Sequence, residues 1–379
     1  MAKYGITVIG VADDSRNYCC STNSCKEVLT TNTSNEELID TLINLGKRLG
    51  DKSVIFPCSD DSVLAISTHR DELTDWYEFV IPEHETIDLL IDKVKFYKYL
   101  ERNGFSIPPT FYVTDKSELK EIANHVKYPC VVKPPRPAQS WFKYFKEKAL
   151  KIRSHQELLA VSDNCLRATD TFIIQEWIDG RDSNIYQYYY YFDKNYEPII
   201  NYTSRKLRQW HIETGEACLA EECLIDPVPR KSIDIYSRIH YKGITSLEIK
   251  IDENNGGYFI IEPDVGRPNT SIGLVEASGV PILYAMYCDA LGLPMPTYST
   301  NKSGSIKWIS LQRDIMAAIK YYARGELTFR DWLMSIKGVK TFAVFSIHDP
   351  LPFIVDFCEL LRKIIESAGR GITDFFKRL

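Results

Sequence analysis

The sequence lacks the patterns that are typical of membrane-spanning, secreted and zinc-binding proteins. It has no run of eighteen consecutive apolar residues, so it predicts no transmembrane segment. Its first residues contain no long apolar stretch, so we expect no signal peptide. Its ten cysteines include no paired CxxC spacing, and its seven histidines show no metal-type spacing. We therefore interpret the cysteines as reduced thiols and expect a cytoplasmic protein.

Excess positive charge and a dinucleotide-binding motif are also missing. The net charge of −5 argues against a nucleic-acid-binding module and against bulk attraction to an anionic membrane. No Gly-x-Gly-x-x-Gly follows the first apolar strand, so we predict no dinucleotide site. The composition is that of an ordinary globular protein, 44% hydrophobic and 26% charged. A chain of 379 residues is long enough for two or three domains.

The first part of the chain alternates between strand and helix patterns, which predicts a small parallel sheet. Asp13 and Asp14 follow the first predicted strand, and Ser59 and Asp60 follow the second. These are the positions at which α/β sheets place ligand contacts. Helix and turn caps explain the same residues equally well, so the sequence leaves both interpretations open. The predicted elements are strands over 4–12 and 53–57 and helices over 35–50 and 62–77.

Two further segments have an ordinary and a functional interpretation. The tyrosine run in residues 186–191 is suited to base stacking, but strand alternation divides its rings between two faces, which favours sheet packing. The C-terminal stretch 356–379 is amphipathic and ends in basic residues. We favour a docked helix over a membrane-surface helix for this stretch.

In the stretch "GGYFIIEPDVGRPNTS", an apolar strand leads directly to two carboxylates. It pairs with "SLEIKID" in a predicted β-hairpin, because Asn-Asn-Gly-Gly lies between two alternating runs. Residues i and i+2 of a strand share a face, so Glu262 and Asp264 point the same way, with Glu248 across from them. A hard cation such as Mg²⁺ would neutralise three acids on one face. The alternative is an exposed face whose acids meet water or lysines, and the apolar lead-in favours the metal.

Other segments offer contacts for a nucleotide. Lys133 leaves a β-branched strand beside a proline-rich loop, and Lys93 begins a helix, although a lone lysine is usually solvated. The strand "FIIQEWIDG" offers backbone hydrogen bonds and apolar contacts to a purine, and Asp182 follows in a position to accept from a ribose hydroxyl. A domain hinge without a ligand explains this strand as well.

The order of these features resembles the ATP-grasp fold, over residues 92–294. It is carried by the helix start Asp92-Lys93, "YPCVVKP", "FIIQEWIDGRD" and "LEIKID…IIEPDVGR". The stretches "FPCSDDSVLAISTHRDEL", "SRKLRQW" and "EPDVGRPNTSIGLVEASGVPI" are similar to bacterial carboxylate–amine ligases of the D-aspartate ligase-like and cell-surface polysaccharide-associated type. The implied fold class is multidomain α/β and α+β. The implied parts are an α/β domain (1–91), an ATP-grasp domain (92–295, with subdomains 92–170 and 171–295) and a mainly helical C-terminal region (296–379).

The resemblance implies a role for each candidate residue. The residues implied to contact ATP are Lys93 and Lys133 at the phosphates, Gln175, Glu176 and Ile178 at the adenine, and Asp182 at the ribose. The implied ligands of Mg²⁺ are Glu248, Glu262 and Asp264, with room for two ions and with Mn²⁺ as a substitute. The implied catalytic residues are Arg267, at the charge on the transferred phosphoryl group, and Lys206 and Arg208, facing the phosphates or the substrate carboxylate.

Three features depart from the family pattern. The last metal ligand is usually asparagine, and here it is Asp264. The loop after Lys133 is usually small and glycine-rich, whereas "PPRPAQSWFKYFKEK" is bulky and basic. We expect this loop to be a lid that uses Arg136, Lys143 and Lys146 on anions. The first domain starts later than in family members, so we expect it to be incomplete at its N-terminus.

The implied reaction is amide formation. The carboxylate takes the γ-phosphoryl group of ATP, and an amine then displaces phosphate from the acyl phosphate, with positioning and charge neutralisation as the work of the protein. The alternatives are an ATP-grasp kinase that phosphorylates a hydroxyl, and an ATP-binding protein without catalysis. The expected partners are a small-molecule carboxylate and amine. An amino acid, a peptide and a surface-glycan precursor are all open, and so is a homodimer.

Overall fold

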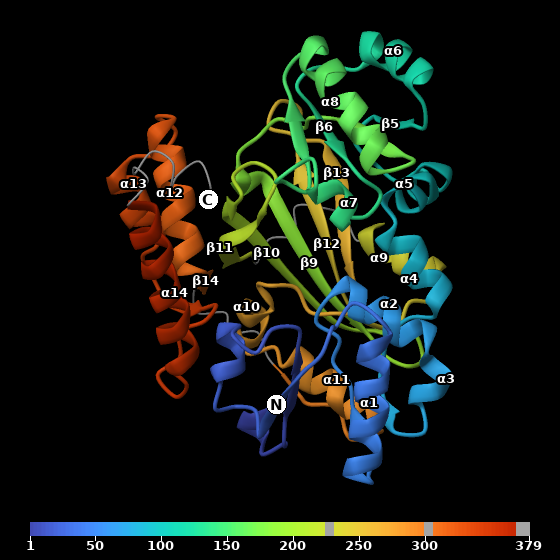
Figure 1. The fold of residues 1–379 in the computed structure, drawn as a ribbon, viewed down its shortest axis with the longest axis vertical. Coiled ribbons are helices and arrows are strands. Elements are labelled where there is room, and N and C mark those ends of the chain that lie inside the picture. Colours follow the sequence, from blue (N-terminus) through green and yellow to red (C-terminus); the bar gives the residue numbers. More distant parts are fainter. Residues whose placement is uncertain (224–230, 299–305, 369–379) are drawn as a thin grey trace.

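The computed structural model describes residues 1–223, 231–298 and 306–368. Figure 1 shows two larger sheets, with the first part of the chain below them and the C-terminal helices along one side. The smaller of these sheets has four strands in the order β5-β8-β6-β7, and the larger has seven in the order β13-β12-β9-β10-β11-β14-β15. The predicted combination of α/β and α+β architecture is confirmed.

The first part of the chain is an α/β arrangement of short parallel strand pairs. Its elements are β1 (Ile9–Ala12), β2 (Glu27–Thr30), α1 (Glu36–Leu49), β3 (Ser53–Val54), α2 (Asp60–Thr68), α3 (Arg70–Leu73), β4 (Tyr77–Glu78) and α4 (His84–Ile91). β1 pairs with β2 and β3 pairs with β4, both in parallel. The sequence predicted parallel pairing correctly, but the structure divides it between two separate pairs. α1 ends where predicted, at Gly50, whose φ of 76° is a left-handed conformation that glycine adopts without strain.

The four-stranded sheet places two polar side chains on the face that lies opposite α6 and α8 and borders the first cavity. Val132 and Ile174 pack with α6 and α8 in a buried cluster. Side chains alternate along a strand, so the adjoining Lys133 and Gln175 point to the opposite face. The elements of this part are α5 (Lys93–Arg102), β5 (Thr110–Val113), α6 (Lys116–His125), β6 (Cys130–Lys133), α7 (Gln139–Phe142), β7 (Leu150–Ile152), α8 (His155–Ala168) and β8 (Phe172–Glu176).

The seven-stranded sheet explains the tyrosine run. Tyr188 and Tyr190 of β9 belong to one buried cluster, and Tyr189 and Tyr191 belong to another on the opposite face. The prediction of ordinary sheet packing is therefore confirmed. The elements here are β9 (Ile185–Phe192), β10 (Pro198–Trp210), β11 (Glu216–Glu222), α9 (Lys231–Arg238), β12 (Gly243–Ile251), β13 (Tyr258–Val265), α10 (Ile272–Ala277), α11 (Ile282–Ala290), β14 (Lys307–Ile309) and β15 (Lys340–Phe342).

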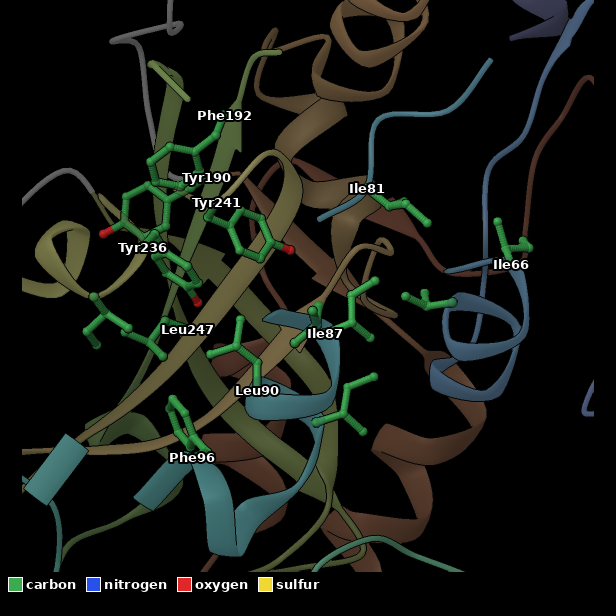
Figure 2. Close-up of a cluster of buried hydrophobic side chains, with 14 of the residues drawn as sticks. Ile66, Ile81, Ile87, Leu90, Phe96, Tyr190, Phe192, Tyr236, Tyr241 and Leu247 are labelled. Atoms are coloured by element: carbon green, nitrogen blue, oxygen red, sulfur yellow. The ribbon is translucent and has the colours of Figure 1, made fainter. Parts of the chain in front are cut away.

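A large apolar cluster fixes the first part of the chain against the seven-stranded sheet. Figure 2 shows Ile87 and Leu90 of α4 beside Leu247 of β12, with Phe96 of α5 below them. All four side chains are at most 1% exposed. Because burial of such side chains is the main stabilising term in folding, this cluster holds the start of the neighbouring α2 at one place over the sheet.

The C-terminal part is mainly helical, as predicted. Three helices lie along one side of the molecule, beside β11 and its neighbours (Figure 1). They are α12 (Leu311–Ala323), α13 (Phe329–Ser335) and α14 (Leu351–Ala368). α14 packs against the 3₁₀ turn Tyr18–Ser21, which agrees with a docked helix. Residues 369–379 of the predicted amphipathic stretch lie outside the described residues. Over the described ranges, no helix is both long and apolar enough to cross a membrane. All ten cysteines are free.

Candidate active site

Two adjoining cavities are lined by residues of both larger sheets. The first lies at the ends of β6 and β8 and contains Lys133 and Glu176, and the second lies over β10, β12 and β13. Their shared lining makes them one continuous site. The residues that line both are Lys93, Pro137, Lys148, Gly215, Glu248 and Glu262.

Lys133 is buried in the first cavity among neutral partners. Its Nζ donates to the Tyr97 hydroxyl at 2.6 Å and to Gln175 Oε1 at 2.9 Å. Burial lowers the pKa of Lys133 from 10.5 to about 7, although the nearby Glu262 carboxylate opposes this shift. Lys133 is therefore ready to gain a proton when an anion arrives beside it.

Glu262 lies between two lysines at the junction of the cavities. Lys93 Nζ is 3.3 Å from Glu262 Oε2, and Lys148 Nζ is 3.6 Å from Glu262 Oε1. Burial alone would raise the pKa of the Glu262 carboxyl, but Lys148 and Lys93 bring it well below its usual range. Glu262 in turn raises the pKa of Lys148, against the effect of burial. Lys148 was not predicted from the sequence, because its place two residues before β7 offers only a weak signal.

The predicted hairpin forms and brings the three acids to one cavity. Glu248 faces Glu262 in register across β12 and β13, and Ser246 faces Asp264. Lys206 donates to Glu248 at 2.6 Å, and Asp264 accepts from the Ser246 hydroxyl at 2.6 Å. The structure thus places Glu248, Glu262 and Asp264 together in the second cavity.

The three acids are each turned toward a cation rather than toward one another. Within the part of the chain that the structure describes, no three His, Cys, Asp or Glu side chains form a metal-ligand cluster. The donor chemistry nevertheless suits Mg²⁺, which proteins usually hold by one or two carboxylates together with substrate phosphates. The predicted set fits that mode of binding better than a closed cage made of protein alone.

Arg267 is fixed by acids from two separate parts of the chain. The preceding Gly266 has a φ of 65°, and this left-handed turn directs the chain back over the cavity. The guanidinium donates to Asp60 at the start of α2, and its Nη2 lies 3.0 Å from Asp264 Oδ1. Burial alone would lower the pKa of Arg267, but Asp264 and Asp60 raise it. Of the open interpretations, Ser59 caps α2, whereas Asp60 lines the second cavity.

Arg208 does not lie in the site, so its predicted role is corrected. Lys206 pairs with Ala220 and Arg208 with Leu219, which makes Leu207 an extra residue of a β-bulge. The bulge reverses the alternation of side chains, so Arg208 leaves the face that Lys206 occupies. It donates to Asp314 of α12 at 2.8 and 3.1 Å, and both side chains are buried.

Asp182 is also placed elsewhere than its predicted role requires. Its carboxylate accepts from the Gln209 backbone at 3.0 Å, from the Gln209 amide at 2.8 Å and from the Tyr321 hydroxyl at 2.6 Å. It is not among the residues that line the two cavities. Burial raises the pKa of this carboxyl. Asp182 thus joins β10 to α12, and these contacts do not support its predicted role at a ribose.

The segment predicted to contact adenine lines the first cavity, together with an aromatic ring to which no role was assigned. Gln175, Glu176 and Ile178 all line the first cavity, and Gln175 also accepts a hydrogen bond from Lys133. Trp177 lines the same cavity, with Lys151 Nζ 3.8 Å and Lys250 Nζ 4.6 Å from its ring centroid. An aromatic residue at the end of an apolar strand was the available signal for this contact.

The loop between β6 and β7 differs from the predicted lid. Arg136 is bound to Asp88, and Lys143 and Lys146 are exposed and do not line the cavities. Trp141 is fully buried, and its ring N–H donates to the Glu147 carbonyl at 2.9 Å. The buried tryptophan anchors the loop in this structure, and its role as a lid stays a prediction.

Solved structures with a similar arrangement identify the fold. The biotin carboxylase–βγ-ATP complex from Campylobacter jejuni matches with a TM-score of 0.63 and 17% identity, over 80% of this chain and 70% of that one. The N5-carboxyaminoimidazole synthetase from Staphylococcus aureus complexed with ADP matches with a TM-score of 0.61 and 15% identity, over 79% of this chain and 74% of that one. The fold is therefore the ATP-grasp fold, as the sequence predicted.

Comparison of the amino-acid sequence with known proteins adds to the structural comparison. No protein-family model matches the chain. A D-aspartate ligase from Enterococcus faecium (strain Aus0004) is 23% identical over 297 residues, which are 73% of this chain and 70% of that protein. The chain therefore has the ATP-grasp fold and is similar in sequence to a D-aspartate ligase.

Proposed function

We propose that the protein is an ATP- and Mg²⁺-dependent ligase that activates a carboxylate as an acyl phosphate and joins it to an amine. The observation that carries this proposal is the pair of adjoining cavities with a shared wall of Lys93, Lys148, Glu248 and Glu262. One cavity has the lining of a nucleotide site, and the other has fixed cations. A group transferred between the two would pass along the shared wall. The similarity to a D-aspartate ligase supports the same reaction class.

The first cavity is the proposed nucleotide site. Glu176, Trp177 and Ile178 would contact the base, and Lys133 and Lys93 would contact the phosphates. Gln175 lines the same cavity and accepts a hydrogen bond from Lys133, so it would hold this lysine beside the nucleotide, and its contact with the base stays a prediction. The solved structures described above were obtained with ADP and a βγ-ATP, which supports a nucleotide in the corresponding place.

The acids of the second cavity are the proposed metal ligands. Glu248, Glu262 and Asp264 would hold Mg²⁺, which when bound would neutralise charge on the phosphates. A second ion and replacement by Mn²⁺ stay predictions. In the structure these carboxylates pair with Lys206, Lys93, Lys148 and Arg267, which a bound metal would partly replace.

The chemistry follows from the charges around the second cavity. An oxygen of the substrate carboxylate attacks the γ-phosphorus of ATP, and the bond to ADP breaks. The amine then attacks the acyl carbon, inorganic phosphate leaves, and the amine releases its proton. Arg267, held by Asp60 and Asp264, is positioned to stabilise the negative charge of the transferred phosphoryl group. Lys206 lines the same cavity and would orient the carboxylate.

The name of the relative suggests the first acid to test, an amino acid such as aspartate. We also propose a division into residues 1–91, 92–295 and 296–379, with the site built mainly by the middle part. The ten free cysteines support a reducing, cytoplasmic location. A homodimer stays a prediction.

Trapping with hydroxylamine tests the reaction without knowledge of the amine. With ATP, Mg²⁺ and a pool of carboxylates that includes D-aspartate, we expect a hydroxamate, formed together with ADP and phosphate. ADP with a stable phosphate ester and no hydroxamate would identify a kinase instead. ATP binding without ADP formation from any pool would identify a binding protein, and the ligase proposal would then be wrong.

A further inference from the structure

We propose that Lys148 binds the terminal phosphoryl group of the nucleotide, in the place that phosphate-binding loops usually give to backbone N–H groups. This inference rests on the proposed function. Lys148 would act with Lys93 on the group that is transferred, so it is a contact for the reacting phosphate rather than for the base.

The loop that borders the phosphate end of the first cavity is poorly suited to binding phosphate through its backbone. Such loops use glycine, which allows successive N–H groups to approach an anion closely. Residues 134–149 contain no glycine, and Pro134, Pro135 and Pro137 have no backbone N–H to donate. A side chain must therefore supply the positive charge from this side of the cavity.

The same loop is anchored at several points, so its cations have fixed places. The Lys93 backbone N–H donates to the Pro135 carbonyl at 3.0 Å, which ties the loop to the start of α5. Arg136 is bound to Asp88, and Trp141 is fully buried. A loop held in this way positions a charge in advance, and it does not need to close over the ligand to do so.

Lys148 alone among the four cations of this fully described loop lines the cavities. Arg136, Lys143 and Lys146 are absent from the lining of both, whereas Lys148 belongs to both. Its Nζ approaches one oxygen of Glu262, and Lys93 approaches the other. Two lysines thus flank the junction of the cavities from different elements, at the place where a phosphoryl group would leave the nucleotide and meet its acceptor.

If Lys148 only pairs with Glu262 to hold the structure, its replacement should affect all nucleotides alike. Titration with ATP, ADP and AMP, which differ in their number of phosphates, therefore distinguishes this role from phosphate binding. Replacement by methionine keeps the length of the side chain and removes its charge. We expect Lys148→Met to weaken binding of ATP at least tenfold, to weaken ADP less, and to leave AMP unchanged in isothermal titration. Lys148→Arg should restore most of the ATP affinity, because it returns the charge. Lys146→Met, in the same loop but exposed, is the matched control and should change none of the three.

Each result distinguishes phosphate binding by Lys148 from a purely structural role of this residue. Equal weakening of ATP and AMP would show that Lys148 only supports the fold of the site, and the proposal would be overturned. Unchanged ATP binding would overturn it as well. A melting temperature measured without nucleotide identifies a variant that has lost its structure, and Lys148→Gln, for which the same pattern with ATP, ADP and AMP is expected, then carries the test. If the unmodified protein binds no ATP, the proposed function fails. If it binds ATP and Lys148→Met binds equally well, only this inference fails.

Discussion

Lys206 and Arg208 lie two residues apart on β10 but serve opposite faces of the sheet. Lys206 binds Glu248 in the second cavity, whereas Arg208 binds the buried Asp314 of α12. Leu207 is the extra residue of a bulge that separates them. One local irregularity therefore assigns one cation to the site and the other to the attachment of the C-terminal helices.

Arg208→Met should destabilise the protein without a direct effect on nucleotide binding. It leaves the carboxylate of Asp314, which is 0% exposed, without a cation and with the Trp332 ring N–H as a donor, and the loss of one partner of a buried pair costs about 3–5 kcal/mol. We expect a lower denaturation midpoint, with unchanged ATP affinity of the folded protein. The double variant Arg208→Met/Asp314→Leu should regain much of the stability. A large loss of ATP affinity in folded Arg208→Met would restore the role in the site that the sequence predicted.

ATP binding should be accompanied by proton uptake at Lys133. The pKa of Lys133 is about 7 in the structure, and phosphate beside it would raise that pKa. Above about pH 7, part of the unliganded protein therefore carries neutral Lys133 and must take up a proton when ATP binds. Titration calorimetry at about pH 8, in buffers of different ionisation enthalpy, measures this uptake. Lys133→Met should bind ATP more weakly and lose the uptake, and an unchanged uptake would assign it to another group.

The same lysine should influence how stability depends on pH. Burial lowers its pKa from 10.5 to about 7, so the unfolded state binds more protons between these pH values. The free energy of unfolding should therefore gain a contribution from Lys133 that rises with pH through this window, by at most about 1.4 kcal/mol per pH unit. Denaturant titrations of wild type and Lys133→Met at about pH 7 and about pH 9 test this. Parallel changes in the two proteins would show that Lys133 is not the group responsible.

Glu262→Gln should have opposite effects on the binding affinities for pyrophosphate and for MgATP. Glu262 neutralises Lys93 and Lys148, so its replacement leaves both lysines without that partner. We expect binding of pyrophosphate in EDTA to strengthen several-fold, whereas binding of MgATP weakens because a proposed metal ligand is lost. Glu216→Gln, an acid of the second cavity that pairs with Arg313, is the control and should change both much less. If both affinities rise in Glu262→Gln, Glu262 serves charge balance and not metal binding.

Asp60 should position Arg267 for the chemical step. Asp60→Asn removes the charge that faces the guanidinium but keeps a side chain of similar size. We expect hydroxamate formation to fall about tenfold or more in kcat, with little change in ATP affinity, because Arg267 acts on charge that develops during transfer. Arg267→Ala should show the same division with a larger loss. Asp61→Asn, the next residue of α2, is the matched control. Equal losses in ATP affinity and kcat for Asp60→Asn would make the pair a binding feature only.

Local patterns in the sequence were sufficient for the parts of the site that depend on neighbours along the chain. The alternation of "FIIEPD" and the turn Asn-Asn-Gly-Gly determined that Glu262 and Asp264 share a face and that Glu248 lies opposite, since a hairpin sets its own register. The sequence predicted two further strands equally well, one that ends in Lys133 and one that ends in Gln175 and Glu176. The resemblance carried by these motifs also indicated the ATP-grasp fold.

Only the tertiary structure decided which charges meet. The bulge at Leu207 follows from how β10 pairs with β11, and strand alternation within β10 alone predicts the wrong face for Arg208. Lys148 lies in the site on a loop that the buried Trp141 anchors, and Asp60 reaches Arg267 because an apolar cluster seats α4 and its neighbours on the sheet. Asp182 accepts hydrogen bonds from Gln209 and Tyr321, which are distant in sequence. Charge pairing depends on distance in space, which a sequence specifies only through the packing of the whole chain.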